Sequence, residues 1–199
     1  MSKKITAAIL LFSMLISIAS CSKTKESESA VNTAPTAIST VAPDVTANTD
    51  SYGNIVYSPL NEGDKAPVFT ADLVGGGTFD LGSNQDKVVL ISFWATWCNP
   101  CVKELPEFEK LSQENIQGFD MVLVNYSEPQ STVDAFISEN NFTVKIAYDD
   151  NGSICDMYPT TGIPYTVILK NGIVRKIFVG KPRNPYETYK NAVQECLNG

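Results

Sequence analysis

The feature that most restricts the fold of this 199-residue chain is a continuous apolar run followed closely by two cysteines. Residues 87–93 read KVVLISF, a run of strand length without polar alternation, as expected for a strand buried on both faces of a sheet. Cys98 and Cys101 come next, and apolar residues from position 99 to about 115 recur on one face of a helix, which Pro106 should kink. The sequence therefore predicts a cysteine pair where a buried strand gives way to the N-terminus of a helix.

The remaining periodic segments alternate between strand and helix patterns. Asn171-Gly172, between two apolar runs, is the strongest hairpin signal among them. The order predicts the α/β class, with a central mixed β-sheet flanked by helices, mainly parallel and with an antiparallel edge. The expected elements are an N-terminal β-hairpin (67–73 and 78–81), strands at 119–126, 144–148, 165–170 and 173–179, and helices at 131–140, 152–158 and 186–197, with Ser131 as a cap.

The chain begins with the pattern of a secretory signal peptide, because Lys3 and Lys4 precede an apolar run, residues 7–18, that is too short for a comfortable membrane span. Ile18-Ala19-Ser20-Cys21 ends this region and resembles the lipobox of bacterial lipoproteins. The resemblance implies cleavage before Cys21 and attachment of lipid to its sulfur, which would anchor the protein to a membrane. Ordinary cleavage, leaving Cys21 as a free thiol, is the alternative.

Residues 21–51 contain no aromatic residue and are rich in Ser, Thr, Ala and Asn, so they cannot bury enough apolar surface to offset the entropy cost of ordering. We therefore divide the chain into a signal peptide at residues 1–20, a lipidated cysteine and flexible tether at residues 21–51, and a folded domain at residues 52–199. This organisation predicts a lipid-anchored protein on the extracytoplasmic side of the cell membrane.

Composition excludes several kinds of chemistry. The chain has no histidine, which removes the commonest general base and the commonest metal ligand. A net charge of −7 without a large basic block argues against nucleic-acid binding. A zinc site would have to combine Cys98 and Cys101 with Cys155 and Cys196, whose spacing is unlike that of a second zinc knuckle. We expect no metal and no organic cofactor.

The position of the cysteine pair favours redox chemistry. Unpaired N–H groups and the positive end of the dipole at a helix N-terminus stabilise a thiolate, so Cys98 is the predicted nucleophile. Cys101 lies one turn further along and can attack a mixed disulfide formed at Cys98. Pro100 fits the first helical turn, where its missing N–H costs little. A purely structural disulfide is the alternative, but it would close a tiny loop and stabilise the fold little.

Residues 88–106, VVLISFWATWCNPCVKELP, resemble the active-site segment of membrane-tethered, extracytoplasmic thioredoxin-like proteins of the TlpA/ResA type. The resemblance continues with Pro164 in TGIPYTVI and can be followed from about Lys65 to the end of the chain. It implies a thioredoxin fold, in which the helix and strand at roughly 131–148 correspond to the family's insertion. The motifs are more specific for the fold than for the physiological partner.

The resemblance also implies roles for residues outside the pair. Pro164 corresponds to the family's cis-proline, which faces the cysteines, and the backbone of Ile163 would pair with an extended client segment. Glu104 matches the acidic residue of the family's C-x-x-E segment. It is expected beneath the pair with a raised pKa, where it could take the proton of Cys101. A solvated helix glutamate is the alternative for Glu104.

Trp97, Asn99 and Pro100 flank the nucleophile and are expected to contact the client. Cys155 and Cys196 depart from the two-cysteine pattern associated with the family. They could form a second disulfide, or they could remain as two buried thiols that behave as small hydrophobes. The sequence leaves both alternatives open.

The resulting hypothesis is a thiol-disulfide oxidoreductase that reduces disulfides of exported client proteins. By resemblance, clients include apocytochrome c or methionine sulfoxide reductase, and a membrane thiol-transfer protein of the CcdA/DsbD type re-reduces the pair. We expect a monomer. Two alternatives stay open: an oxidase that donates its disulfide, and a non-catalytic thioredoxin-fold module that binds metal or a partner protein. Strong oxidants often carry a histidine between their cysteines, so Asn99-Pro100 favours the reductase.

Overall fold

The computed structural model describes residues 47–199. The predicted signal peptide, Cys21 and most of the predicted tether lie outside these residues. The last part of the predicted tether is not irregular, because β1 (Ala47–Thr49) pairs antiparallel with β2 (Ile55–Tyr57). The Asp50 carboxylate forms the turn between them by accepting hydrogen bonds from the backbone N–H groups of Tyr52 (2.8 Å) and Asn54 (2.9 Å). A turn of this kind needs only an aspartate and the backbone next to it, so the polar composition of the segment did not predict it.

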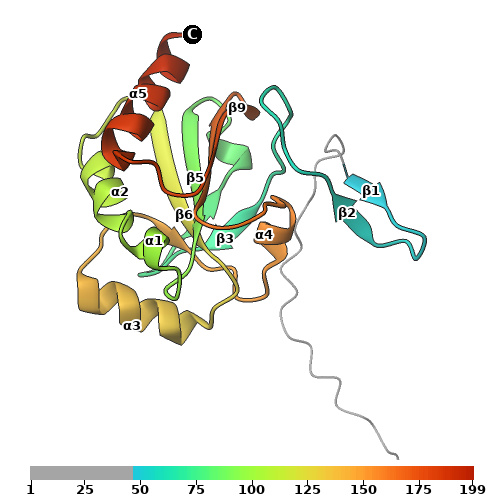
Figure 1. The fold of residues 1–199 in the computed structure, drawn as a ribbon, viewed down its shortest axis with the longest axis horizontal. Helices are drawn as coiled ribbons and strands as arrows, with labels where there is room; N and C mark the ends of the chain where they lie inside the picture. Colours follow the sequence, from blue (N-terminus) through green and yellow to red (C-terminus); the bar gives the residue numbers. More distant parts are fainter. Residues whose placement is uncertain (1–46) are drawn as a thin grey trace, which may run out of the picture. The chain divides into compact units, whose positions relative to one another are not determined.

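A five-stranded mixed sheet, in the order β7-β6-β5-β8-β9, forms the centre of the fold (Figure 1). The expected mixed sheet is confirmed, but the expectation that it is mainly parallel is wrong. The β5–β6 and β6–β7 pairs are parallel, whereas the β5–β8 and β8–β9 pairs are antiparallel. The reason is that the hairpin turning at Asn171-Gly172 lies directly against the middle strand. The strands are β5 (Val88–Trp94), β6 (Phe119–Asn125), β7 (Ile146–Ala147), β8 (Tyr165–Lys170) and β9 (Ile173–Val179).

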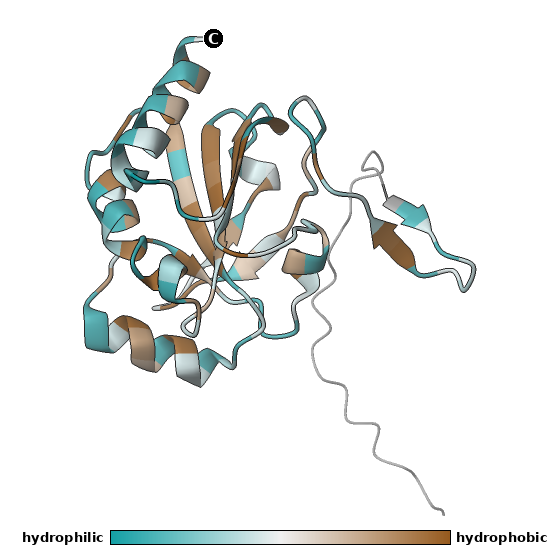
Figure 2. Ribbon diagram, in the orientation of Figure 1, coloured by the Kyte–Doolittle hydropathy of each residue, from teal (hydrophilic) through white to brown (hydrophobic). Residues whose placement is uncertain are grey.

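The middle strand β5 is buried along its whole length, as its unbroken apolar sequence predicts. Val88, Leu90 and Trp94 belong to one hydrophobic cluster, and Val89, Ile91 and Phe93 belong to another. Helices α1 (Asn99–Val102), α2 (Leu105–Ser112), α3 (Gln130–Asn140) and α5 (Pro185–Asn198) contribute to the first cluster. Figure 2 shows hydrophobic middle strands beside an α5 of mixed character, as expected for a helix that covers a sheet with one face.

The second cluster lies on the opposite face of the sheet. It is covered by the hairpin of β3 (Thr70–Asp72) and β4 (Thr78–Asp80), by Leu81 just before the 3-10 helix η1 (Gly82–Asn84), and by α4 (Ser153–Asp156). The predicted N-terminal hairpin is therefore confirmed, with shorter strands than expected. Its turn contains three consecutive glycines, all at positive φ, a conformation that glycine adopts without steric cost.

The helix predicted from residue 99 to about 115 is divided in two. Its first part ends at Val102, and the second begins at Leu105 with Glu104 as its N-cap residue. Pro106 therefore lies in the first turn of α2, where no helical partner exists for its missing N–H, and the prediction that it kinks a continuous helix is wrong. Ser131 does not cap its helix either, because α3 begins at Gln130 after Pro129.

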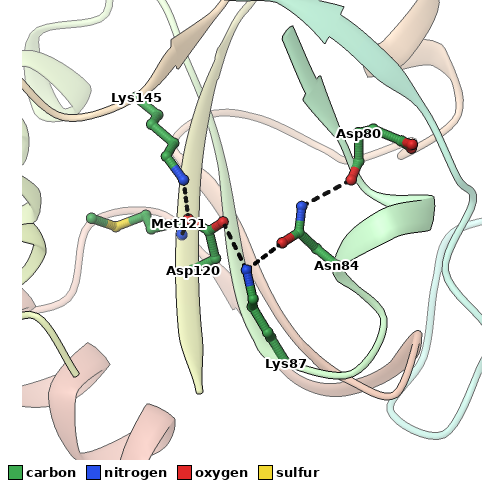
Figure 3. A network of polar contacts seen from close by, with 6 residues as sticks. All are labelled: Asp80, Asn84, Lys87, Asp120, Met121 and Lys145. Carbon is green, nitrogen blue, oxygen red and sulfur yellow. Dashed lines mark hydrogen bonds and ion pairs between the residues drawn. The ribbon is translucent and has the colours of Figure 1, made fainter. Parts of the chain in front are cut away.

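A polar network ties together the end of the sheet at which β5 and β6 begin (Figure 3). Asp120 at the start of β6 accepts a hydrogen bond from the Lys145 ammonium group (2.5 Å) and lies 3.8 Å from that of Lys87. Lys87 also donates to Asn84 in η1 (2.8 Å). These contacts lie at the amino ends of β5 and β6, so they leave the carboxyl ends of the same strands free to carry a site.

None of the helices in residues 47–199 has the length and hydrophobicity to cross a membrane.

Candidate active site

The cysteine pair lies where β5 leads into α1, as the sequence predicts. Cys98 is the N-cap of α1, with an extended backbone, and its Sγ accepts a hydrogen bond from the N–H of Cys101 (3.3 Å). Pro100 occupies the first turn. Cys98 and Cys101 are joined by a disulfide, with 5.2 Å between their Cα atoms. An N–H group aimed at the Cys98 sulfur would also stabilise its thiolate after reduction.

Access to the two sulfurs differs. Cys98 is 5% exposed and lines a groove, whereas Cys101 is 1% exposed and does not line it. The Cys98 Sγ lies 3.7 Å from the carbonyl oxygen of Ile163. The Ile163–Pro164 peptide bond is cis, which confirms the expectation for this proline. The structure thus brings the predicted nucleophile and the predicted cis-proline loop together.

The groove beside Cys98 has a volume of about 650 Å³. Its lining includes Trp97, Asn99, Pro100 and Ile163, the four residues predicted to contact a client, and Trp97 is 65% exposed. The rest of the lining, which includes Tyr126, Asp156, Tyr158 and the segment 159–162, was not predicted from the sequence. Tyr126 could have been predicted to lie near Cys98, because it directly follows β6 and the carboxyl ends of the parallel strands β5 and β6 meet at one edge of the sheet.

The chemical character of the groove is apolar and aromatic. Asp156 is the only charged residue in its lining. Exposed Val179 ends β9 beside the cis-proline loop, because the N–H of Gly180 donates to the carbonyl oxygen of Pro164 (2.8 Å). Backbone groups, aromatic rings and the disulfide-bonded sulfur of Cys98 suit an extended polypeptide that exchanges disulfides.

Glu104 lies in the first hydrophobic cluster's interior and is 0% exposed, so the alternative of a solvated helix glutamate is wrong. Burial raises its pKa from the ordinary 4.5 to about 7, and Tyr189 and Lys181 oppose that rise. The hydroxyl of Tyr189 donates to Glu104 Oε1 (2.6 Å), while Oε2 has no hydrogen-bond partner among the described residues. The direction of this shift is the one expected for Glu104, and a carboxyl group poised near neutral pH can exchange protons with a thiol.

Residues 61–194 match the family described as Redoxin. The chain belongs to the Redoxin family. It is 35% identical over 124 residues to "Thiol-disulfide oxidoreductase ResA" of Oceanobacillus iheyensis, covering 59% of this chain and 65% of that protein. It is also 35% identical over 125 residues to "Thioredoxin-like protein YneN" of Bacillus subtilis, covering 61% of this chain and 73% of that protein. The crystal structure of StoA from Bacillus subtilis superposes with a TM-score of 0.58 at 28% identity, covering 63% and 95% of the two chains.

These relatives confirm the predicted fold and the predicted class of enzyme. This redoxin has the thioredoxin-like fold and is a thiol-disulfide oxidoreductase with a Cys98–Cys101 disulfide at its groove. The resemblance to the TlpA/ResA type is likewise confirmed.

A second buried carboxylate holds the loop before the pair in this redoxin. Glu128 Oε2 accepts hydrogen bonds from the N–H of Thr96 (2.7 Å) and from Asn125 Nδ2 (2.8 Å), and Oε1 accepts one from the Thr96 hydroxyl. Three donors thereby fix the segment that leads into Trp97 and Cys98. Glu128 was not predicted from the sequence, because nothing in its local pattern connects it to a residue 32 positions earlier.

Cys155 and Cys196 are free and buried. Cys155 belongs to the cluster on the α4 side of the sheet and Cys196 to the cluster on the α5 side. Burial raises the pKa of both thiols, and the nearby Asp149 carboxylate raises that of Cys155 further. Of the two alternatives, buried thiols are confirmed, and the four cysteines are not brought together as a zinc site would require.

Proposed function

We propose that this protein reduces disulfide bonds in other proteins on the extracytoplasmic side of the cell membrane. The observation that carries the proposal is the asymmetry of the pair: only Cys98 opens into a groove, and it does so beside the Ile163 carbonyl, where an extended client can pair with backbone. A site for a small molecule would need no such open strand-like edge.

The reaction proceeds by two thiol–disulfide exchanges. The Cys98 thiolate attacks one sulfur of the client disulfide, forms a mixed disulfide and releases the first client thiolate. The Cys101 thiol gives its proton to Glu104 and attacks Cys98 Sγ, which breaks the mixed disulfide and releases the second client thiolate. Two electrons pass to the client, and the protein is left with the Cys98–Cys101 disulfide.

The cellular setting follows from the N-terminal sequence. The signal pattern and Cys21 support export and lipid anchoring, with the residues between Cys21 and β1 as tether. A membrane thiol-transfer protein of the CcdA/DsbD type then restores the dithiol. The clients are exported proteins with an accessible disulfide, such as apocytochrome c or methionine sulfoxide reductase, and the protein acts as a monomer without a cofactor.

The reduction potential of the Cys98–Cys101 pair tests the direction of electron flow. A value near or below that of thioredoxin, about −270 mV, supports a reductase. A value near −120 mV, typical of strong oxidants, overturns the proposal and favours disulfide donation. Absence of a reversible two-electron couple would indicate a non-catalytic binding module. Variants in which serine replaces Cys155 and Cys196 keep the measured couple restricted to the active-site pair.

A further inference from the structure

A chain of buried polar side chains begins at Glu104. The Tyr189 hydroxyl donates to Glu104 Oε1 (2.6 Å) and lies 3.4 Å from the hydroxyl oxygen of Thr166, which in turn is 2.8 Å from that of Ser92. All four side chains are buried. These hydrogen bonds link Glu104, the N-cap of α2, to α5 and to strands β5 and β8, so segments far apart in sequence meet near this carboxyl group.

The aromatic ring of Tyr189 is held rigidly. It stacks on Phe108 with 5.0 Å between ring centroids and an interplanar angle of 13°, and it meets Phe178 edge to face at 5.2 Å. Phe108 comes from α2, the helix that Glu104 begins. A ring packed on two sides has little freedom to rotate its hydroxyl away, so the hydrogen bond to Glu104 is preorganised.

Few charged or titratable groups act on Glu104. Tyr189 comes from α5, and Lys181, in the connection before α5, acts through its charge. Lys103, the C-cap of the cysteine helix, is exposed, and Cys101, which is a thiol only after the disulfide is reduced, is the proton donor in the proposed step. Tyr186, the other buried tyrosine of α5, donates to Glu114 instead. Tyr189 is therefore the only side chain that donates a hydrogen bond to Glu104 within the described residues.

We propose that Tyr189 is a positioning residue whose hydrogen bond to Glu104 sets the pH range in which Glu104 takes the proton of Cys101. The inference rests on the proposed function, since it assumes the second exchange step described above. A hydroxyl that donates to a carboxylate stabilises its charged form, which is the form that accepts a proton. Without the hydroxyl, only the charge of Lys181 opposes the effect of burial, so Glu104 stays protonated to higher pH and release of the client slows at neutral pH.

The test is a single-turnover reaction of the reduced protein with a disulfide-bonded peptide, followed from pH 5 to 9. The rate of the second step should rise with pH around a midpoint near neutrality. In Tyr189→Phe, which keeps the ring stacking, that midpoint should move up by about one pH unit, because a hydrogen bond to a charged group is worth about a tenfold change in equilibrium. Below the midpoint the rate should fall about tenfold, and at high pH it should return to the wild-type value.

Tyr186→Phe is the matched control, because it removes a tyrosine hydroxyl from the same helix without touching Glu104. Its midpoint should equal that of the wild type. The inference would be overturned if the pH midpoint of the second step in Tyr189→Phe were also equal to that of the wild type. If Tyr189→Phe does not fold, 3-fluorotyrosine at position 189 replaces it: its more acidic hydroxyl is a stronger donor and should lower the midpoint, and an unchanged midpoint again overturns the inference.

A second readout separates this inference from the proposed function. The carboxyl carbon of Glu104 can be titrated by NMR in the oxidised protein, which needs no catalytic turnover. An upward shift in Tyr189→Phe supports the role of Tyr189 even if the protein proves not to reduce disulfides. If the Glu104 titration is unshifted in Tyr189→Phe while the wild-type protein does reduce disulfides, the proposed function stands and the positioning role of Tyr189 is rejected.

Discussion

Cys155 and Cys196 pack on opposite faces of the central sheet, in two separate hydrophobic clusters. The middle strand β5 of the sheet between them is buried along its whole length, so no small movement of α4 or α5 could bring the two sulfurs into bonding distance. The only disulfide within residues 47–199 is the one at the groove.

The first prediction concerns these two thiols. Burial raises the pKa of both, so neither should react with iodoacetamide in the folded, oxidised protein, and both should react after unfolding in denaturant. Peptide mapping by mass spectrometry distinguishes the sites. A peptide linked through Cys155 and Cys196 would contradict the arrangement on opposite faces.

The second prediction concerns the order of attack by the pair. Cys101→Ser should accumulate a stable mixed disulfide on Cys98 when it meets a disulfide-bonded peptide, because the attacking sulfur is present and the resolving one is missing. Cys98→Ser should form no such adduct, since Cys101 is 1% exposed and outside the groove. Intact-mass measurement shows the adduct directly.

Cys155→Ser is the control for this experiment, because Cys155 lines the same groove but has a raised pKa. It should turn over like the wild type. An adduct that forms on Cys155 rather than on Cys98 in the Cys101→Ser variant would refute the assigned nucleophile.

The third prediction follows from the pKa of Glu104, which burial raises from 4.5 to about 7. A raised pKa means that the folded state binds the proton more tightly than the unfolded state. The resulting stabilisation is present below pH 4.5 and is lost as the pH rises to about 7. At about 1.4 kcal/mol per pH unit, the loss is at most about 3 kcal/mol.

Glu104→Gln removes this titration, so the free energy of unfolding of the variant minus that of the wild type should increase between pH 4.5 and 7.5. The difference between the two proteins isolates Glu104 from Asp80 and Glu109, whose pKa values are lowered and which act in the opposite direction. Urea unfolding of the oxidised proteins at several pH values supplies the numbers. A difference that stays constant with pH would show that Glu104 titrates in the same range folded and unfolded.

The fourth prediction concerns the Glu128 carboxylate, which accepts three hydrogen bonds from Thr96 and Asn125. Glu128→Gln removes the negative charge, so the hydrogen bonds from the Thr96 N–H and Asn125 become neutral, and its amide nitrogen cannot accept a hydrogen bond from the Thr96 hydroxyl as Oε1 does. Stability should fall by about 1–3 kcal/mol. The rate of peptide reduction should fall several-fold, because the loop that carries Trp97 and Cys98 loses part of its anchorage.

Glu139→Gln serves as the control, since Glu139 is an exposed glutamate on α3. It should leave both the melting temperature and the rate unchanged. If Glu128→Gln behaves in the same way as Glu139→Gln, the hydrogen bonds to Thr96 do not hold the loop in solution.

Local sequence was sufficient for the elements that carry the reactive sulfurs. The unbroken apolar run of β5 predicts a strand buried on both faces. The residues after it predict Cys98 at a helix N-terminus with Pro100 in the first turn. The groove contacts of Trp97, Asn99 and Ile163 were also predicted, although Ile163 came from resemblance rather than from spacing.

Local sequence misplaced features that depend on competition between neighbouring interactions. The apolar spacing from residue 99 to about 115 is helical throughout, yet the helix is interrupted before Leu105. Periodicity reports which face is buried and does not show where a backbone hydrogen-bond series breaks. In the same way, nothing in the run of residues 165–179 shows that their hairpin lies beside β5 and makes half of the sheet pairings antiparallel.

The sequence by itself determined the chemistry of this protein: two cysteines at a strand–helix junction, no histidine, and a buried strand to hold them. Only the tertiary structure decided the electrostatic surroundings of that chemistry. Tyr189 reaches Glu104 across 85 residues and Glu128 reaches Thr96 across 32. Such contacts arise when helices and loops pack onto a sheet, and periodicity along the chain carries no information about them, because a hydrogen bond between distant residues depends on three-dimensional proximity alone.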